Sequence, residues 1–275
     1  SSDKEEANYT TTMGALTSTS TTCSVGMGTY NVGYLDTDFS FAGILGRNAV
    51  LNKYGEGTMS LTGNSNACPV TIYEGTVEAT NTSKAYTTGL TTVKSGGKLY
   101  GKGIASNVTV EKEGIVASTK SGLPTARLKV NGTLTVNRGG VVQVRARKST
   151  SKISNDGFEV SGTAKFISPV IEITLTNDAV WVAGDSIQVV KGKGKIFLSG
   201  TPTFIPETPG AGLQWDDSTF TTDGIIRVTS DGTGINNSAF SIQHSGAPIY
   251  DLTGRKIETI TEKGIYIING KKVIR

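Results

Sequence analysis

Histidine is nearly absent from this chain of 275 residues, and cysteine is scarce. The single histidine, His244, argues against multi-histidine metal sites and confines any histidine-based catalysis to one position. The two cysteines, Cys23 and Cys68, lack the spacing of a zinc site. They either form a disulfide closing a loop of about 46 residues, which the chain-entropy model values at about 4 kcal/mol, or remain two free thiols.

Charge and long apolar runs are also sparse. Charged residues make up 18% of the chain, and the net charge of +4 comes without a clustered basic stripe, so the sequence predicts no nucleic-acid partner. No apolar run approaches the roughly 18 residues that span a bilayer, so no direct membrane span is predicted. Residues 1–12 contain neither a basic start nor an apolar stretch, and we therefore expect no signal peptide in this chain.

Small, β-branched and turn-forming residues dominate what remains. The chain contains 35 glycines together with many threonines and serines, whereas the long straight-chain residues that favour helices are few. This composition favours strands and tight turns over a helical bundle or an alternating α/β enzyme.

Short apolar alternations recur between glycine or asparagine turns. Leu128–Val130, Leu134–Val136 and Val142–Val144 each alternate apolar and polar residues, with Asn131-Gly132 and Gly139-Gly140 between them. Such alternation is typical of a strand with one buried face. No helical pattern of the length that a crossover would need lies between these segments.

This rhythm predicts a parallel β-helix, in which each strand pairs with its counterpart in the next coil. A coil of three short strands needs about 20–25 residues, so the chain has room for about ten. One coil buries too little apolar surface to offset its own ordering, so the coils must stack. The alternative is an antiparallel β-sandwich, whose strands are usually longer and whose turns are more widely spaced.

Two segments carry a family resemblance. Asn52–Asn64 (NKYGEGTMSLTGN) and Val70–Ala79 (VTIYEGTVEA) resemble the passenger-associated repeat of autotransporters, in which a K-x-G-x-G-x-L-x-L opening is followed by T-x-V-x-x-G-T-L. Met59 and Val77 replace two of the usual leucines. Further segments between residues 40 and 228 are similar to other coils of these passengers: Gly96–Gly103, Val108–Val110, Leu213–Ser218 and Gly224–Val228. The resemblance implies a right-handed β-helix on a secreted or surface-exposed protein, most often an adhesin.

The sequence changes character after about Ala247. Ile249–Ile257 (IYDLTGRKI) and Gly264–Arg275 (GIYIINGKKVIR) are typical of short strands, and Asn269-Gly270 is a strong hairpin signal. These segments resemble the C-terminal sorting or anchoring module of Bacteroidetes-type secreted proteins, with its YDLxGR and KGIYIxNGKK signatures. The resemblance implies a bacterial secretion or anchoring machinery as partner. A small β cap over the edge of the last coil would explain the same residues.

A polysaccharide lyase or glycoside hydrolase is the main alternative, because such enzymes also use β-helices. A hydrolase needs carboxylates about 5–10 Å apart. In a strand, however, the adjacent pair Asp216-Asp217 would point to opposite faces. The NTD, GHG and RIK signatures of the hydrolases are missing. Arg145 and Arg147 would share an outer strand face without a nearby acid in the sequence, which favours a solvated face over a lyase site.

Three other features have an ordinary and a functional interpretation. Asp36-Thr37-Asp38 places two carboxylates on one strand face, which is either solvated or able to hold calcium. Lys191–Lys195 (KGKGK) is either a solvated turn or a contact for acidic glycans. Trp215, Tyr250 and Tyr266 either stack on sugars or belong to a core or cap.

Together these observations predict an all-β protein with a right-handed parallel β-helix over residues 1–246 and a small β module over residues 247–275. We expect a non-enzymatic, secreted or cell-surface protein associated with the outer membrane, with no catalytic residues, metal or cofactor. It would be an adhesin or stalk presenting loops to a glycan or a host or cell-surface protein. A pure glycan-binding module is a third possibility. The candidate binding residues are Arg145, Arg147, Trp215 and Asp216.

Overall fold

The structure, a computed structural model, describes residues 9–63, 66–150, 152–231, 248–257, 265–268 and 271–274. The chain divides into two compact units, Ser1–Gly234 and Ile235–Arg275. The predicted boundary between residues 246 and 247 lies outside the described residues.

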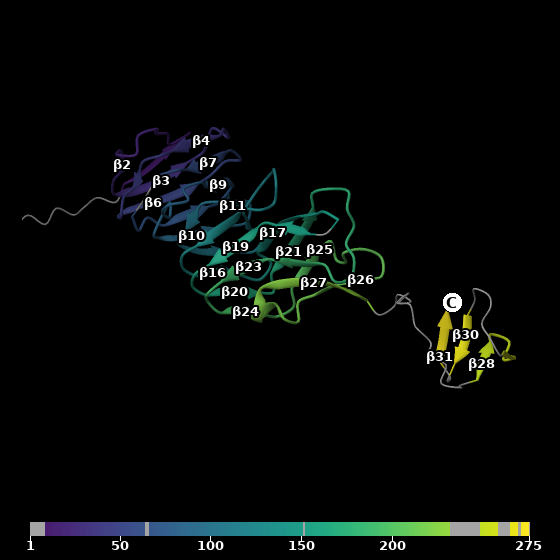
Figure 1. Cartoon of the computed structure of the whole chain (residues 1–275). Coiled ribbons are helices and arrows are strands. Elements are labelled where there is room, and N and C mark those ends of the chain that lie inside the picture. The colour runs from purple at the N-terminus through teal and green to yellow at the C-terminus, as the bar shows by residue number, and fades with distance from the viewer. Residues whose placement is uncertain are drawn as a thin grey trace, which may run out of the picture. The chain divides into compact units, whose positions relative to one another are not determined.

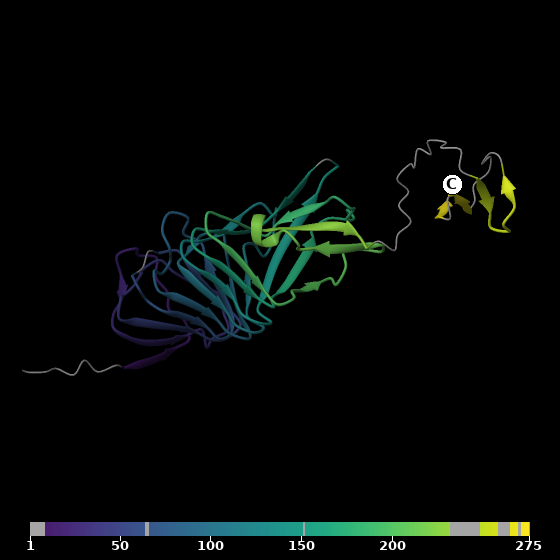
Figure 2. The ribbon, with the colours of Figure 1, turned by 90° about the horizontal axis from the view of Figure 1, so that it is seen from below.

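Three stacks of short parallel strands form the sides of the first unit (Figures 1 and 2). Sheet 1 contains nine strands, in the order β1 (Thr10–Met13), β3 (Gly28–Val32), β6 (Ala49–Lys53), β8 (Val70–Ile72), β10 (Leu90–Val93), β13 (Asn107–Val110), β16 (Leu134–Val136), β20 (Ala164–Ile167) and β24 (Ile196–Ser199).

Sheet 2 runs through β4 (Phe39–Phe41), β7 (Thr58–Leu61), β9 (Gly75–Ala79), β11 (Gly97–Gly101), β14 (Ile115–Ala117), β17 (Val141–Lys148), β21 (Val170–Leu175) and β25 (Thr203–Ile205), and its ninth strand is β18 (Ile153–Asn155), which pairs antiparallel with β17. The third side consists of β2 (Ser24–Val25) with β5 (Ile44–Leu45), and of sheet 3, formed by β12 (Ile104–Ala105), β15 (Arg127–Val130), β19 (Gly157–Val160) and β23 (Val190–Gly192).

The chain visits these sides in turn and pairs each strand with the strand one coil later. This arrangement confirms the predicted parallel β-helix, and the alternative of an antiparallel sandwich is wrong for the body of the unit. The observed coils vary in length more than the predicted range of about 20–25 residues allows. Val93 is in register with Val110, 17 residues later, whereas Phe166 is in register with Leu198, 32 residues later. Loops and the hairpin between strands absorb the difference.

The interior consists of columns of side chains that repeat from coil to coil. In sheet 2 one column contains the buried residues Phe39, Met59, Val77, Leu99, Val116, Val142 and Ile171. One inner column of sheet 1 contains a lysine, because Lys53 lies in register between Val32 and Ile72. Its fully buried ammonium donates to the carbonyls of Tyr54 and Gly55, both at 2.6 Å.

Glycine is required where successive turns touch. Gly55 has φ of +67°, and a Cβ at this position would lie 2.2 Å from the carbonyl oxygen of Gly33 in the preceding coil. A side chain here would strain the backbone and push the two coils apart. The glycines of the KYGEG segment therefore set the tight turn under which the ammonium of Lys53 is buried.

An antiparallel cap covers the end of the interior. It consists of β22 (Ser186–Gln188), β26 (Leu213–Asp216), β27 (Ile225–Ser230) and the short helix α1 (Phe220–Asp223). Buried Phe220 packs edge-on against Phe166, with ring centroids 5.3 Å apart. No helix among the described residues is long and apolar enough to span a bilayer.

The second unit is a small antiparallel sheet, as predicted for the C-terminal residues. Its strands are β28 (Ile249–Asp251), β29 (Lys256–Ile257), β30 (Ile265–Ile268) and β31 (Lys271–Ile274), in the order β29-β28-β30-β31. The carboxylate of Asp251 accepts the backbone N–H groups of Thr253 and Arg255, both at 2.9 Å, and so closes the turn of the YDLTGR segment. The predicted Asn269-Gly270 turn lies outside the described residues, although β30 and β31 pair around it.

Candidate functional site

The two candidate arginines lie on β17, on either side of buried Ala146, and so on the outer face. The Arg145 guanidinium is occupied, because it donates to the Thr119 hydroxyl and to the Gly122 carbonyl, both at 3.0 Å. Arg147 is exposed. Arg145 therefore fastens the loop of residues 118–126 (the 118–126 loop) to sheet 2, which leaves Arg147 as the solvent-facing member.

An acid that the sequence analysis missed lies beside Arg145. Asp156 is fully buried and accepts the backbone N–H of Arg145 at 2.7 Å and the hydroxyl of Thr119. Burial raises the pKa of Asp156, against these hydrogen bonds and the charges of Arg145 and Arg127. Eleven residues separate Arg145 from Asp156, but the β17–β18 hairpin pairs Ala146 with Asn155 and closes that gap. Only a correct hairpin prediction would have found the contact.

The 118–126 loop also contacts earlier coils of sheet 2. The ammonium of Lys120 lies 5.4 Å from the centroid of the Tyr100 ring and donates to the Thr58 hydroxyl at 3.0 Å. Leu123 in this loop is 63% exposed. The loop thus presents an apolar side chain while both of its flanks are held against the sheet.

Polar side chains follow one outer column of sheet 2. Tyr100 donates to Gln143 at 2.9 Å across the small Ala117, and Gln143 donates to Glu172 at 2.9 Å. Glu78, in the same column, accepts the Ser60 hydroxyl at 3.2 Å. Four strand steps separate Glu78 from Glu172, which is about 19 Å at the usual strand spacing. This separation is too large for a hydrolytic acid–base pair, which needs about 5–10 Å.

Three tyrosines form an exposed ladder at the turn after sheet 1. Tyr54 stacks on Tyr34 and on Tyr73, with centroid separations of 5.1 and 4.8 Å. Stacking covers both faces of the Tyr54 ring and one face each of Tyr34 and Tyr73. This geometry suits coil-to-coil stabilisation better than the stacking of a sugar on a free ring face.

The two C-terminal candidates, Trp215 and Asp216, belong to the cap. Trp215 is 9% exposed, packs edge-on against Trp181 at 5.5 Å, and donates its indole N–H to the Pro206 carbonyl at 2.9 Å. Asp216 accepts the backbone N–H of Ser218 at 2.9 Å, and hydrogen bonds from Ser218 lower its pKa. Both residues contribute to the cap, and the structure does not bring them near the arginines of β17.

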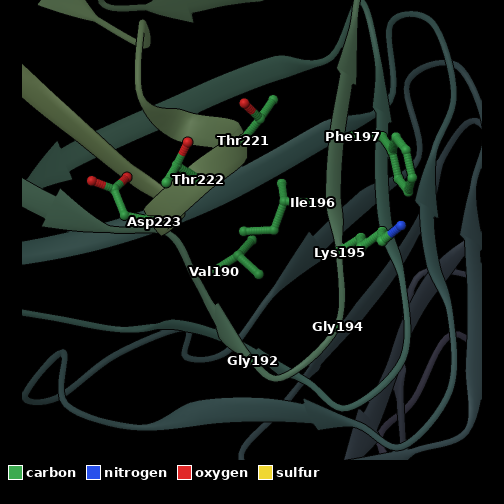
Figure 3. Close-up of a pocket in the computed structure, with 9 residues that line it drawn as sticks. All are labelled: Val190, Gly192, Gly194, Lys195, Ile196, Phe197, Thr221, Thr222 and Asp223. Atoms are coloured by element: carbon green, nitrogen blue, oxygen red, sulfur yellow. The ribbon is translucent and has the colours of Figure 1, made fainter.

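A pocket of about 450 Å³ lies between the last coil and α1. Figure 3 shows Thr221, Thr222 and Asp223 on the helix side, and Lys195 and Phe197 on the strand side. Lys195 extends toward Phe197 and away from the helix (Figure 3). The Asp223 carboxylate is held by Arg227 at 2.5 Å, and this contact lowers the pKa of Asp223.

The remaining candidates have structural contacts. Asp36 and Asp38 precede β4 and accept the backbone N–H groups of Glu56 and Thr58, at 2.9 and 2.6 Å, so these carboxylates join neighbouring coils. No cluster of three or more His, Cys, Asp or Glu side chains suited to a metal occurs among the described residues.

The other sequence candidates are a thiol pair, two tyrosines and the histidine. Cys23 and Cys68 are free thiols, so of the two alternatives the structure contains the unpaired one. Tyr250 lies 36% exposed on β28, and Tyr266 lies on β30. His244 lies outside the described residues.

The chain was compared with models of protein families and with curated proteins, and neither comparison finds a match.

Proposed function

We propose that this chain is a non-enzymatic β-helix scaffold, an adhesin or stalk that presents loops and turns to a glycan or protein partner on a cell or in a matrix. One observation supports this proposal above the others: four outward carboxylates hold neighbouring coils together. Asp36 and Asp38 bind backbone groups of the next coil, and Glu78 and Glu172 bind side chains of neighbouring coils.

The architecture suits such a role. Stacked parallel strands form a surface whose outward side chains repeat about every 4.8 Å. Loops inserted between the strands project from this surface without disturbing the core. The 118–126 loop is such an insertion, and the contacts of Arg145 and Asp156 hold its base. A loop held in one conformation loses less entropy when it binds a partner.

We also propose where this chain acts and how it reaches that location. An adhesin acts outside the cell, so we propose a secreted or cell-surface location, with the small sheet of the second unit acting as a sorting or anchoring module. The support for this part is the sequence resemblance of Ile249–Ile257 and Gly264–Arg275 together with their pairing as one separate sheet.

Attachment of the whole chain to cells tests the function. Beads coated with the folded chain should bind cells or matrix-coated surfaces, whereas beads coated with the denatured chain should not. In parallel, the chain is incubated with neutral and acidic polysaccharides and the reducing ends and unsaturated products are measured. Turnover that disappears in Glu78→Gln or Glu172→Gln would overturn the proposal in favour of a polysaccharide-active enzyme.

A further inference from the structure

The last coil turns from sheet 3 into sheet 1 through the segment Lys191–Lys195, which alternates lysine and glycine. A Cβ at Gly192 would lie 2.0 Å from the Val160 carbonyl, and one at Gly194 would lie 1.5 Å from the Gly162 carbonyl. The two glycines thus let the backbone pass directly against the preceding coil. The lysines between and after them remain exposed on the outside of the corner.

Positive charge at this corner is specific to the last coil. The strand registers place 193–195 above 161–163 and 131–133 of the two preceding coils. Those corners read Ser161-Gly162-Thr163 and Asn131-Gly132-Thr133 and carry no charge. The glycine is kept for packing, so the lysines at the flanking positions are not needed for the turn itself.

The cations at this corner differ in how close they lie to an acidic residue. Lys191 lies in register with Glu159 of the preceding coil, so an acidic residue is its cross-strand neighbour. Among the described residues, no ion pair involves Lys165, Lys193 or Lys195. The one acid that lines the adjoining pocket, Asp223, is already paired with Arg227. The surface around the corner is therefore cationic.

An aromatic ring lies on the same outer face. Phe197 is 49% exposed, and its cross-strand neighbour in sheet 1 is Lys165. Figure 3 places the Lys195 ammonium on the side of the Phe197 ring, while Thr221 and Thr222 border the pocket from α1. The pocket volume of about 450 Å³ lies within the range of roughly 300–1,000 Å³ that is usual for small-ligand sites.

We propose that Lys165, Lys193, Lys195 and Phe197 form a binding site for an acidic glycan. Its carboxylate or sulfate groups accept charge-assisted hydrogen bonds from the ammonium groups, and the apolar face of a sugar ring packs on Phe197. This proposal names a ligand class for the adhesin proposed above and rests on that function.

Binding of defined polymers to the immobilised full chain tests the site. Heparin supplies sulfates, polygalacturonate supplies carboxylates alone, and dextran is the neutral control. Lys193→Gln combined with Lys195→Gln should weaken binding about tenfold, because two exposed charge contacts are lost. Phe197→Ala should weaken it about threefold. The matched control, Lys84→Gln with Lys102→Gln, removes equal charge from exposed positions elsewhere and should leave the affinity unchanged.

The results separate the two proposals. Equal glycan affinity of the wild type and the Lys193/Lys195 variant, at unchanged melting temperature, would overturn the proposed site. Cell attachment by that same variant would still support the adhesin function. Competition by double-stranded DNA as effective as that by the glycan would also overturn the site, since it would indicate a general polyanion surface. If the wild type shows neither glycan binding nor cell attachment, the proposed adhesin function is overturned as well.

Discussion

The tyrosine ladder allows a quantitative test of how the coils hold together. Tyr54 stacks on two neighbours, Tyr34 and Tyr73, whereas each of those rings stacks on one. A stacked aromatic pair contributes about 0.5–1.5 kcal/mol beyond the burial of its area. Tyr54→Leu, which keeps apolar bulk, should therefore lower the free energy of unfolding by about 1–3 kcal/mol, and Tyr73→Leu by about half as much.

Guanidinium unfolding followed by far-ultraviolet circular dichroism gives the free energies, and native-state hydrogen exchange shows where the loss falls. In a stack of coils the effect should be strongest in β3, β6 and β8 and weak in β19 and β23. Tyr54→Phe keeps the ring and serves as the control. The reasoning is refuted if Tyr54→Leu costs no more than Tyr73→Leu, or if Tyr54→Phe costs as much as Tyr54→Leu.

Three further outcomes follow from individual contacts. Burial raises the pKa of Cys68 to about 12, so iodoacetamide should label Cys23 first in the native chain; equal labelling by mass spectrometry would contradict this. Asp156→Ala should cost about 2–4 kcal/mol in thermal unfolding and Asp156→Asn less, because the amide still accepts hydrogen bonds. Since the pKa of Asp156 is raised, its contribution to stability is greatest below its ordinary value of 3.8 and is lost as pH rises through the folded-state pKa, a dependence that Asp156→Asn should abolish. The pKa of Asp223 is lowered by Arg227, so that pair contributes above about pH 3.8 and loses its effect as pH falls through the folded-state pKa; Arg227→Gln should cost only about 0.5 kcal/mol at neutral pH, because both side chains are about one-third exposed.

The repeat of short strands could be predicted because strand periodicity is a local property. Leu128–Val130, Leu134–Val136 and Val142–Val144 alternate with the period of two that a half-buried strand requires, and all three segments lie within strands. Coil length could not be predicted as well, because it depends on how many residues project in loops. The step from Val110 to Val136 includes the 118–126 loop, which adds length without adding a strand.

Local patterning did not locate two buried charged residues. The sequence analysis did not place the side chain of Lys53, which lies in an inner column of sheet 1, where turn carbonyls accept hydrogen bonds from its ammonium. Asp156 was overlooked as a partner of Arg145 for a similar reason: the contact exists only because β18 folds back on β17. Both cases depend on which groups the turns bring close.

By itself, the sequence determined the all-β class, the stacking of coils and the separate small sheet at the C-terminus, because alternation and turn residues act over a few neighbours. The tertiary structure decided which polar and charged side chains have partners inside the fold. Arg145, Trp215 and Asp216 are engaged in internal contacts, whereas Lys193 and Lys195 on the last corner form no ion pair with the residues that the structure describes. The physical reason is that the partners of a polar side chain are set by the register between coils, and residues 17 to 32 positions apart in the chain become neighbours only when the coils stack.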